Sequence, residues 1–217
     1  NPATGEIRTY PTGVARDPHT MVFDGRGNIW FTSQNANQIG RLNMATGEVR
    51  LVEAAPEPSN PYGIVLDGNG VPHVALLRTN AIVRVNPETM ELTRFQQGDP
   101  AARSRRLAVT DDGMIWYGDE ARGMLGRIDP RTGQTKEWQA PGGPESRPYA
   151  VTRDGQGRIW FSQAGEDKKL VGFDPRSEEF FAIHDVSGTI RHMMFDARSG
   201  AMWFGTDANN IGRLIID

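Results

Sequence analysis

Residues 17–32 read DPHTMVFDGRGNIWFT, and variants of this stretch recur four more times along the chain of 217 residues. Alignment of the copies on one aromatic position gives Trp30, His73, Trp116, Trp160 and Trp203, which are 43 or 44 residues apart. A repeat of about 40 to 45 residues is typical of β-propeller blades. The sequence therefore predicts five units of one repeat architecture.

Each unit contains four short segments that favour β-structure, separated by turn residues. In the first unit the segments are PHTMVFD, IWFTSQ, IGRLN and VRLVEA, and the turns between them are DGRGN, NANQ and MATGE. Gly, Asn and Asp supply the positive φ angles that tight hairpin turns require. Four such strands in succession predict one four-stranded blade.

We therefore predict an all-β fold, a five-bladed β-propeller that forms a single domain over residues 1–217. The blades are expected at about 13–54, 55–98, 99–140, 141–185 and 186–217. Residues 1–12 are expected to form an outer closing strand, because NPATGEIRTY at 1–10 matches NMATGEVRLV at 43–52 and the last unit has three strand segments. Pairing into the last blade would close the ring and remove its open sheet edges. The alternative is a longer propeller cut short, with a gap in the ring.

Composition excludes several classes of function. The chain has 24 Lys and Arg against 27 Asp and Glu, without a basic block, so we expect no nucleic-acid partner. It has no apolar run of about 18 residues, so we expect no membrane span. Without cysteine, it cannot form disulfides or thiolate metal sites. Because the chain begins at Asn1, we expect that a preceding segment was removed, and we favour an exported or periplasmic location and a monomer.

One position in the repeated stretch varies from copy to copy. Counting back five residues from the acid of each turn (Asp24, Asp67, Asp111, Asp154 and Asp196) gives His19, Tyr62, Arg106, Tyr149 and Arg191. All five would lie near the start of an innermost strand, and in a ring they would converge on one mouth of the central channel. Arginine suits carboxylate and phosphate groups, and tyrosine adds a flat apolar face with a polar tip. This pattern predicts a pocket for a small polar or anionic ligand; the alternative is that these side chains face solvent or pair with acids such as Asp17 and Asp207.

The segments PYGIVLDGNG, NAIVRVNPET, DGRGNIWFTSQNANQIGRL and DGQGRIWFSQ resemble blades of the streptogramin B lyases, also called the virginiamycin B lyase family. The resemblance extends over essentially the whole chain, although the characterised bacterial lyases have seven blades and this chain has five units. The resemblance implies a C–O lyase that opens a cyclic depsipeptide at its ester by elimination. It also implies a Mg²⁺ ion and a general-base histidine at the channel mouth.

The resemblance implies roles for individual residues of this chain. The segment DPH at 17–19 matches the Glu-x-His motif of the lyases, which places Asp17 as a metal carboxylate and His19 as the base. A second family histidine falls on Arg191, next to His192, and a second carboxylate falls on Gln34 or Asn35. Two functions therefore stay open: a Mg²⁺-dependent lyase, or a non-catalytic module that binds a small molecule or a protein partner.

The sequence also bears on glycoside hydrolysis and on the role of His73. Five-bladed propellers include glycosidases, which need two opposed carboxylates in the channel. No acid occupies the five aligned positions, and Asp119, Glu120 and Asp207 are the nearest candidates. His73 stands where the other units have tryptophan, so it is expected to be a hydrogen-bonded residue packed between blades.

Overall fold

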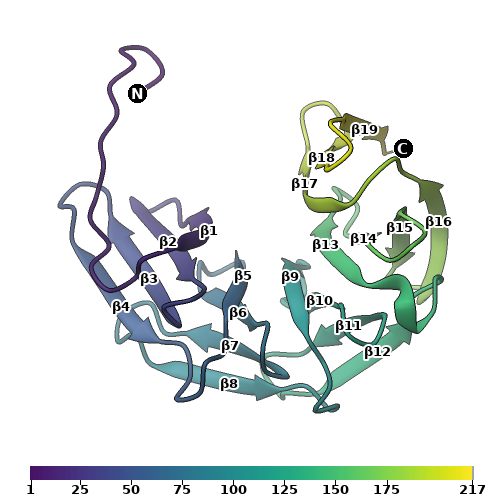
Figure 1. The fold of residues 1–217 in the computed structure, drawn as a ribbon, viewed down its shortest axis with the longest axis horizontal. Helices are drawn as coiled ribbons and strands as arrows, with labels where there is room; N and C mark the ends of the chain where they lie inside the picture. Colours follow the sequence, from purple (N-terminus) through teal and green to yellow (C-terminus); the bar gives the residue numbers. More distant parts are fainter. Residues whose placement is uncertain (217) are drawn as a thin grey trace.

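Strands make up nearly all the regular structure of this protein, a computed structural model in which residues 1–216 are described (Figure 1). Blade 1 contains β1 (Pro18–Phe23), β2 (Asn28–Ser33), β3 (Gln38–Asn43) and β4 (Val49–Glu53). Blade 2 contains β5 (Pro61–Leu66), β6 (Pro72–Leu76), β7 (Ala81–Val85) and β8 (Leu92–Gln96). Blade 3 contains β9 (Ser104–Val109), β10 (Ile115–Asp119), β11 (Met124–Ile128) and β12 (Thr135–Gln139).

The second half of the chain continues the pattern after a short 3₁₀ helix, η1 (Pro144–Ser146). Blade 4 contains β13 (Pro148–Arg153), β14 (Ile159–Gln163), β15 (Lys169–Asp174) and β16 (Glu179–Asp185). Blade 5 contains β17 (Ile190–Asp196), β18 (Ala201–Thr206) and β19 (Ile211–Ile215). Within residues 1–216, no helix is long and apolar enough to cross a membrane.

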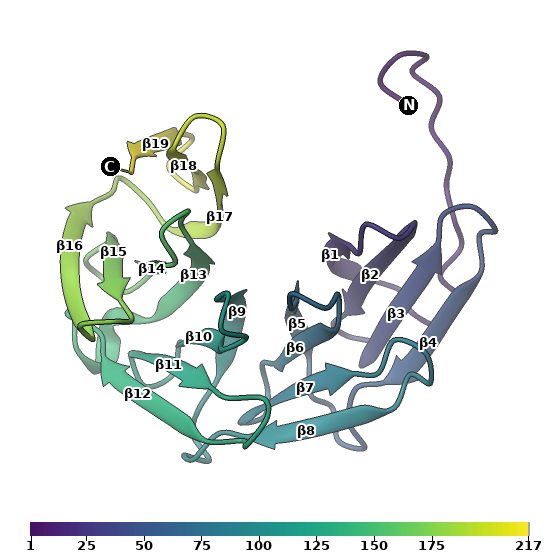
Figure 2. The same cartoon turned by 180° about the vertical axis from the view of Figure 1, so that it is seen from behind.

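The blades follow one another around a common axis. Each sheet is antiparallel with its strands in sequence order, and the first strand of each blade lies nearest the axis (Figures 1 and 2). These inner strands contact one another in series, from β1 through β5, β9 and β13 to β17. The predicted all-β, five-bladed propeller is confirmed.

Apolar side chains fill the spaces between successive blades. Trp30 of blade 1 packs with Ile64 and Val74 of blade 2. Between blades 3 and 4, the buried side chains of Trp116 and Phe161 belong to one cluster. Each such side chain contributes about 1.5 to 3 kcal/mol when it is removed from water. The interfaces between blades, rather than one central core, therefore hold the fold together.

The recurring Ile-Gly-Arg of the third strand has a steric explanation. A Cβ atom at Gly40 would overlap the ring of Phe31, and one at Gly212 would overlap the ring of Phe204. The glycine lets the aromatic side chain of the second strand lie flat across the third strand, as close backbone approach requires. Close packing thus requires glycine at this position of the third strand.

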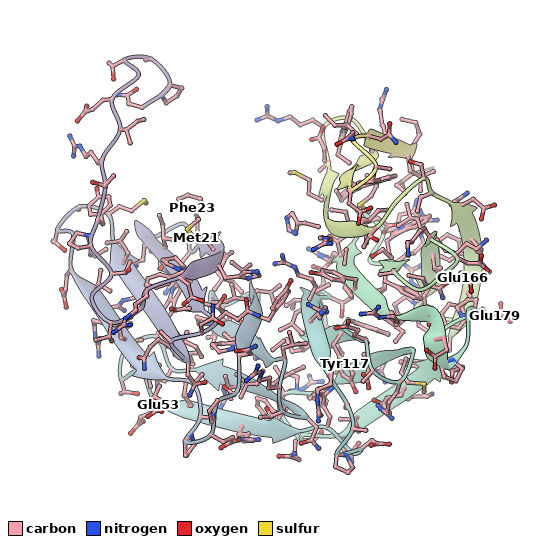
Figure 3. The ribbon with its side chains drawn as sticks, in the orientation of Figure 1. Met21, Phe23, Glu53, Tyr117, Glu166 and Glu179 are labelled. Atoms are coloured by element: carbon pink, nitrogen blue, oxygen red, sulfur yellow. The ribbon has the colours of Figure 1, made fainter. Side chains whose placement is uncertain are left out.

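The expected closing strand is corrected by the structure. Residues 1–17 form no strand, and β19 lies at the edge of a three-stranded sheet. Figures 1 and 2 show the first and last blades as two arms of an arc, with the N-terminal segment extending from the first. Met21 and Phe23 of β1 are about two-thirds exposed, and Figure 3 shows them on the open side of blade 1. The match between the two chain ends does not ensure closure, because the packed blade interfaces set the curvature.

Candidate functional site at the channel mouth

Every inner strand begins with a β-bulge. Pro18 pairs with Ser33 and Met21 with Phe31, so β1 has one residue more than β2 over this stretch. The same irregularity occurs at the start of β5, β9, β13 and β17. Bulges of this kind redirect side chains and are common beside active sites. The bulged pairs are His19–Thr20, Tyr62–Gly63, Arg105–Arg106, Tyr149–Ala150 and Arg191–His192.

The register corrects the sequence alignment of blade 3 by one residue. The amide of Thr110 bonds the carbonyl of Met114, just as the amide of Asp154 bonds that of Arg158. Thr110, and not Asp111, therefore holds the position of the turn acid. Arg105 is consequently the structural equivalent of His19, Tyr62, Tyr149 and Arg191, whereas Arg106 is equivalent to Thr20 and His192.

The replacement of this acid by threonine has a chemical reason. The Trp160 indole donates a hydrogen bond to the Asp154 carboxylate at 3.0 Å, and the Trp116 indole donates to the Thr110 hydroxyl at 3.1 Å. Either oxygen satisfies a buried N–H. In blade 2, His73 takes the position of the indole. Its side chain is fully buried and its Nε2 lies 3.3 Å from the Asp67 carboxylate, which confirms the expected role as a buried, hydrogen-bonded residue.

Two tyrosines meet across the start of blade 3. The hydroxyls of Tyr62 and Tyr149 are hydrogen-bonded, and both side chains are buried. The His19 ring lies 4.4 Å from the Tyr62 ring, and the Arg106 guanidinium lies 5.1 Å from the same ring. Four of the five predicted pocket residues are therefore brought together. Arg191 is not among them: its side chain is 65% exposed and lies 3.7 Å from Asp207.

The two adjacent arginines differ in how their charge is balanced. Arg105 lies 4.6 Å from the Tyr149 ring and forms an ion pair with Glu120, which also binds Arg147 at 2.5 Å. Arg106 donates to the Thr20 hydroxyl at 2.9 Å, and its Nε is buried with no hydrogen-bond partner. Among residues 1–216 no carboxylate pairs with Arg106. Burial lowers the pKa of Arg106, yet arginine stays charged in proteins.

Cavities on either side of this cluster separate the roles of the two arginines. A channel cavity of about 1330 Å³ runs along the inner strands and is lined by Thr20, Arg106 and His192 among others. A smaller cavity of about 370 Å³ lies at the rim, lined by Arg105, Glu120 and the loop that contains η1. The positive charge of Arg106 therefore faces the channel cavity, whereas Arg105 is paired with Glu120 at the rim.

Two histidines adjoin the Arg106 charge. Partial burial, followed by the positive charge of Arg106, lowers the pKa of both His19 and His192. The His19 Nδ1 lies 2.9 Å from the Thr20 hydroxyl, which also accepts from Arg106. Neutral imidazoles both donate and accept hydrogen bonds, so near pH 7 His192 adds a donor and an acceptor to the mouth, whereas His19, whose Nδ1 is engaged with Thr20, adds its other ring nitrogen.

Asp17 holds the local backbone together. One carboxylate oxygen accepts from the Ser33 hydroxyl at 2.7 Å, and the other accepts from the Asn35 amide at 2.7 Å. These hydrogen bonds outweigh burial and lower the pKa of Asp17. Asp17 thus joins the start of β1 to the β2–β3 turn.

The residues present do not fit the magnesium ion that the family resemblance implied. Mg²⁺ requires oxygen ligands in octahedral geometry, usually with one or two carboxylates. Both oxygens of Asp17 are already engaged, and in the described part of the chain no three acidic or histidine side chains gather where a metal could bind. No chemical step is therefore assigned to a metal at this mouth.

The acids considered for glycoside hydrolysis are also engaged. Asp119 is fully buried and accepts from the Arg103 amide and the Arg122 side chain. Glu120 lies between Arg105 and Arg147, which lower its pKa against the effect of burial. Such carboxylates position the rim loops, and the ion-paired Glu120 is poorly suited to donate a proton.

Comparison with known proteins identifies the family. A sequence profile of the virginiamycin B lyase family matches residues 57–217. The chain belongs to this family. No curated protein matches it significantly.

Solved structures of virginiamycin B lyases share the fold. A catalytically inactive histidine-to-alanine variant of the Staphylococcus aureus enzyme, solved with quinupristin, has a TM-score of 0.81 at 22% identity, over 96% of this chain and 69% of the lyase. A streptogramin B lyase has a TM-score of 0.80 at 24% identity, over 90% and 64% of the two chains. The chain thus spans about two-thirds of the length of these lyases.

The virginiamycin B lyase fold is shared more widely. A putative 6-phosphogluconolactonase from Bacteroides fragilis has a TM-score of 0.77 at 16% identity, over 97% of this chain and 69% of its own. At such identities the likeness extends to the fold alone. The function of this member of the virginiamycin B lyase family must therefore be argued from its own channel mouth.

Proposed function

We propose that the channel mouth binds a small molecule with a carboxylate or phosphate group, and that Arg106 is the main partner of that group. The observation that carries this proposal is the unbalanced charge of Arg106, whose Nε is buried without a partner. A buried charge without a counter-ion costs several kcal/mol. An anionic ligand in the channel cavity, which Arg106 lines, would supply the missing counter-charge.

The surroundings of Arg106 suit such a ligand. The Tyr62 ring provides a flat face beside the guanidinium, and the channel cavity is large enough for a small organic molecule. His192 and His19 add neutral hydrogen-bonding groups near the same charge. Guanidinium groups bind carboxylate and phosphate through two parallel hydrogen bonds, which gives orientation as well as affinity.

Isothermal titration calorimetry with inorganic phosphate and with acetate would test this proposal. Arg106→Gln is expected to weaken binding by about 10- to 100-fold, the equivalent of one charged hydrogen bond. Arg105→Gln is the matched control, because Arg105 is already paired with Glu120, and it should change the affinity less than threefold. Equal binding by Arg106→Gln and the unmodified protein would refute the proposal.

A second candidate is elimination on an ester, favoured by the placement of His19. His19 packs on Tyr62 and shares the Thr20 hydroxyl with Arg106. In this reaction the imidazole takes the proton from the carbon next to a carbonyl, and the electron pair forms a carbon–carbon double bond. The carbon–oxygen bond of the ester then breaks and its oxygen leaves as a carboxylate. Arg106 would stabilise negative charge on the carbonyl oxygen.

Incubation with a streptogramin B-type depsipeptide, followed by chromatography with mass detection, would test the elimination. The expected product has the mass of the substrate and a different retention time. Its formation should be lost in His19→Ala. Phosphate binding without any product in the unmodified protein would reject elimination while leaving the binding proposal in place.

A further inference from the structure

The channel cavity extends past Arg106 along a set of apolar side chains. Between the bulge and the following turn, β5 and β9 carry no charged side chain, and neither does β1. Each side chain of the set is partly buried, because it packs into a blade interface and also lines the cavity. We call this set the apolar stretch, and it consists of Val22, Val65, Leu66 and Val109.

The apolar stretch lies in the interior of the arc of blades. Val65 and Leu66 belong to β5 and Val109 belongs to β9, and each of these two strands contacts another inner strand on both sides (Figure 1). Val109 follows Arg106 by three residues on β9, which corresponds to about 10 Å at about 3.3 Å per residue. A molecule held at Arg106 can therefore extend a body of medium length along the stretch.

Two acids farther along the same cavity are already engaged. Asp111 forms an ion pair with Arg153 at 2.5 Å. One carboxylate oxygen of Asp67 accepts from two backbone amides, and the other lies 3.3 Å from the His73 Nε2. These acids therefore offer little to a cationic group on a ligand, which favours an uncharged body beyond Arg106.

The mouth suits a single negative charge. Arg105 is balanced by Glu120, and His19 and His192 are neutral near pH 7 because burial and Arg106 lower their pKa. Arg106 thus remains as one guanidinium facing the cavity. Phosphate groups are commonly bound by clusters of arginine, whereas one guanidinium can hold a carboxylate through two parallel hydrogen bonds.

We propose that the ligand of the channel mouth is a monocarboxylic acid with an aliphatic body, whose carboxylate lies at Arg106 and whose body lies along the apolar stretch. This inference rests on the proposed function and narrows its ligand class. A medium-chain acid such as hexanoate spans the distance from Arg106 toward Val109. Removal of its alkyl surface from water supplies affinity that acetate lacks.

Calorimetric titration of the protein with acetate, butanoate and hexanoate would test this inference. Each added CH₂ should tighten binding about two- to fourfold, so hexanoate should bind at least about tenfold more tightly than acetate. Hexanol has the same chain without the charge and should bind at least about tenfold more weakly than hexanoate. Arg106→Gln should weaken the binding of hexanoate. Arg84→Gln is the matched control and should not, because Arg84 lies two strands farther from the axis, beside Phe95.

A variant of the apolar stretch supplies a second measurement. Val65→Ser should reduce the ratio of hexanoate to acetate affinity at least about threefold. Val49→Ser is the control and should keep the ratio, because Val49 belongs to β4, the outermost strand of blade 1. The series of acids needs no variant, so a folding defect in Val65→Ser leaves the first test intact.

The outcomes separate this inference from the proposed function. Equal affinities for acetate and hexanoate would overturn the inference and leave anion binding at Arg106 in place. The same holds if phosphate binds and neither acid does. Absence of binding by all three anions would overturn the proposed function as well. Hexanol that binds as tightly as hexanoate, or hexanoate binding that depends on Arg84 and not on Arg106, would overturn both.

Discussion

Loss of charge at two adjacent arginines should change the free energy of unfolding by different amounts. Arg105→Gln removes a charged hydrogen bond to Glu120 and a guanidinium 4.6 Å from the Tyr149 ring. A charged hydrogen bond contributes about 1.5 to 3 kcal/mol and a cation–π contact about 0.5 to 2 kcal/mol. Because Arg147 still pairs with Glu120, the expected loss in the free energy of unfolding is about 2 to 4 kcal/mol.

Arg106→Gln should cost little or should stabilise the protein. It removes the hydrogen bond to Thr20 and the contact with Tyr62, which together contribute about 2 to 4 kcal/mol. It also removes a partly buried charge that has no carboxylate partner among residues 1–216, and burial of such a charge costs several kcal/mol. The two contributions nearly cancel, so the change should lie within about 1 kcal/mol of zero.

Urea unfolding followed by tryptophan fluorescence would measure both variants without added anions. The expected order is that Arg105→Gln destabilises the fold by at least about 1 kcal/mol more than Arg106→Gln does. Equal destabilisation by the two variants would mean that the Arg106 charge is already satisfied in the folded protein. An anionic ligand would then have no unbalanced charge to neutralise.

Three other predictions concern neighbouring parts of the fold. Asp17→Ala should lower the free energy of unfolding by about 2 kcal/mol, because its hydrogen bonds to Ser33 and Asn35 are lost. The phosphate affinity measured by calorimetry should stay the same in this variant, with Mg²⁺ or with EDTA. A phosphate affinity that depends on Mg²⁺ and is lost in Asp17→Ala would restore Asp17 as a metal ligand. Burial lowers the pKa of His73 against the pull of Asp67, so its contribution to stability is present above the unfolded pKa of about 6.5 and is lost as the pH falls below it. His73→Phe should therefore lose less stability between about pH 7 and pH 5 in urea titrations than the unmodified protein, and an unchanged pH dependence would contradict this. Gly63→Ala should lower the free energy of unfolding by about 1 to 3 kcal/mol, because its Cβ would meet the Arg105 carbonyl. Gly68→Ala is the control: its Cβ would meet nothing within 4 Å, so the melting temperature should not fall. Equal melting temperatures of the two variants would contradict the close packing at Gly63.

The architecture could be predicted from the sequence because each blade repeats the same local requirements. Turn residues recur in all five blades, and an aromatic in the second strand and a glycine in the third strand recur in four of the five. Closure could not be predicted in the same way. Whether residues 1–12 reach β19 depends on the angle at every blade interface, and no short segment of sequence encodes that angle.

The candidate site could be predicted only in part. Counting from the turn acids located His19, Tyr62 and Tyr149 but selected Arg106 in place of Arg105 as the equivalent residue. The error arose because Thr110 accepts the indole hydrogen bond that an aspartate accepts elsewhere. Counting six residues back from Trp116, as from Trp30 to Asp24, would have found Thr110. The pairing of Arg105 with Glu120, which leaves Arg106 unbalanced, depends on the rim loops and has no signature in the repeat.

The β-bulge at the start of each inner strand lets residues at the mouth differ between blades without changing how the rest of the strand pairs. The extra residue restores the alternation of side chains before the rest of the strand, so residues such as Met21 and Leu107 keep their pairing with the second strand. Substitutions within the bulges therefore change the chemistry of the mouth while the blade interfaces keep their register. Five blades with two such positions each give ten bulge residues, of which Gly63 is fixed because the next strand packs against it and Ala150 because it is buried in the core. A library randomised at the other eight would explore new ligands on the same scaffold.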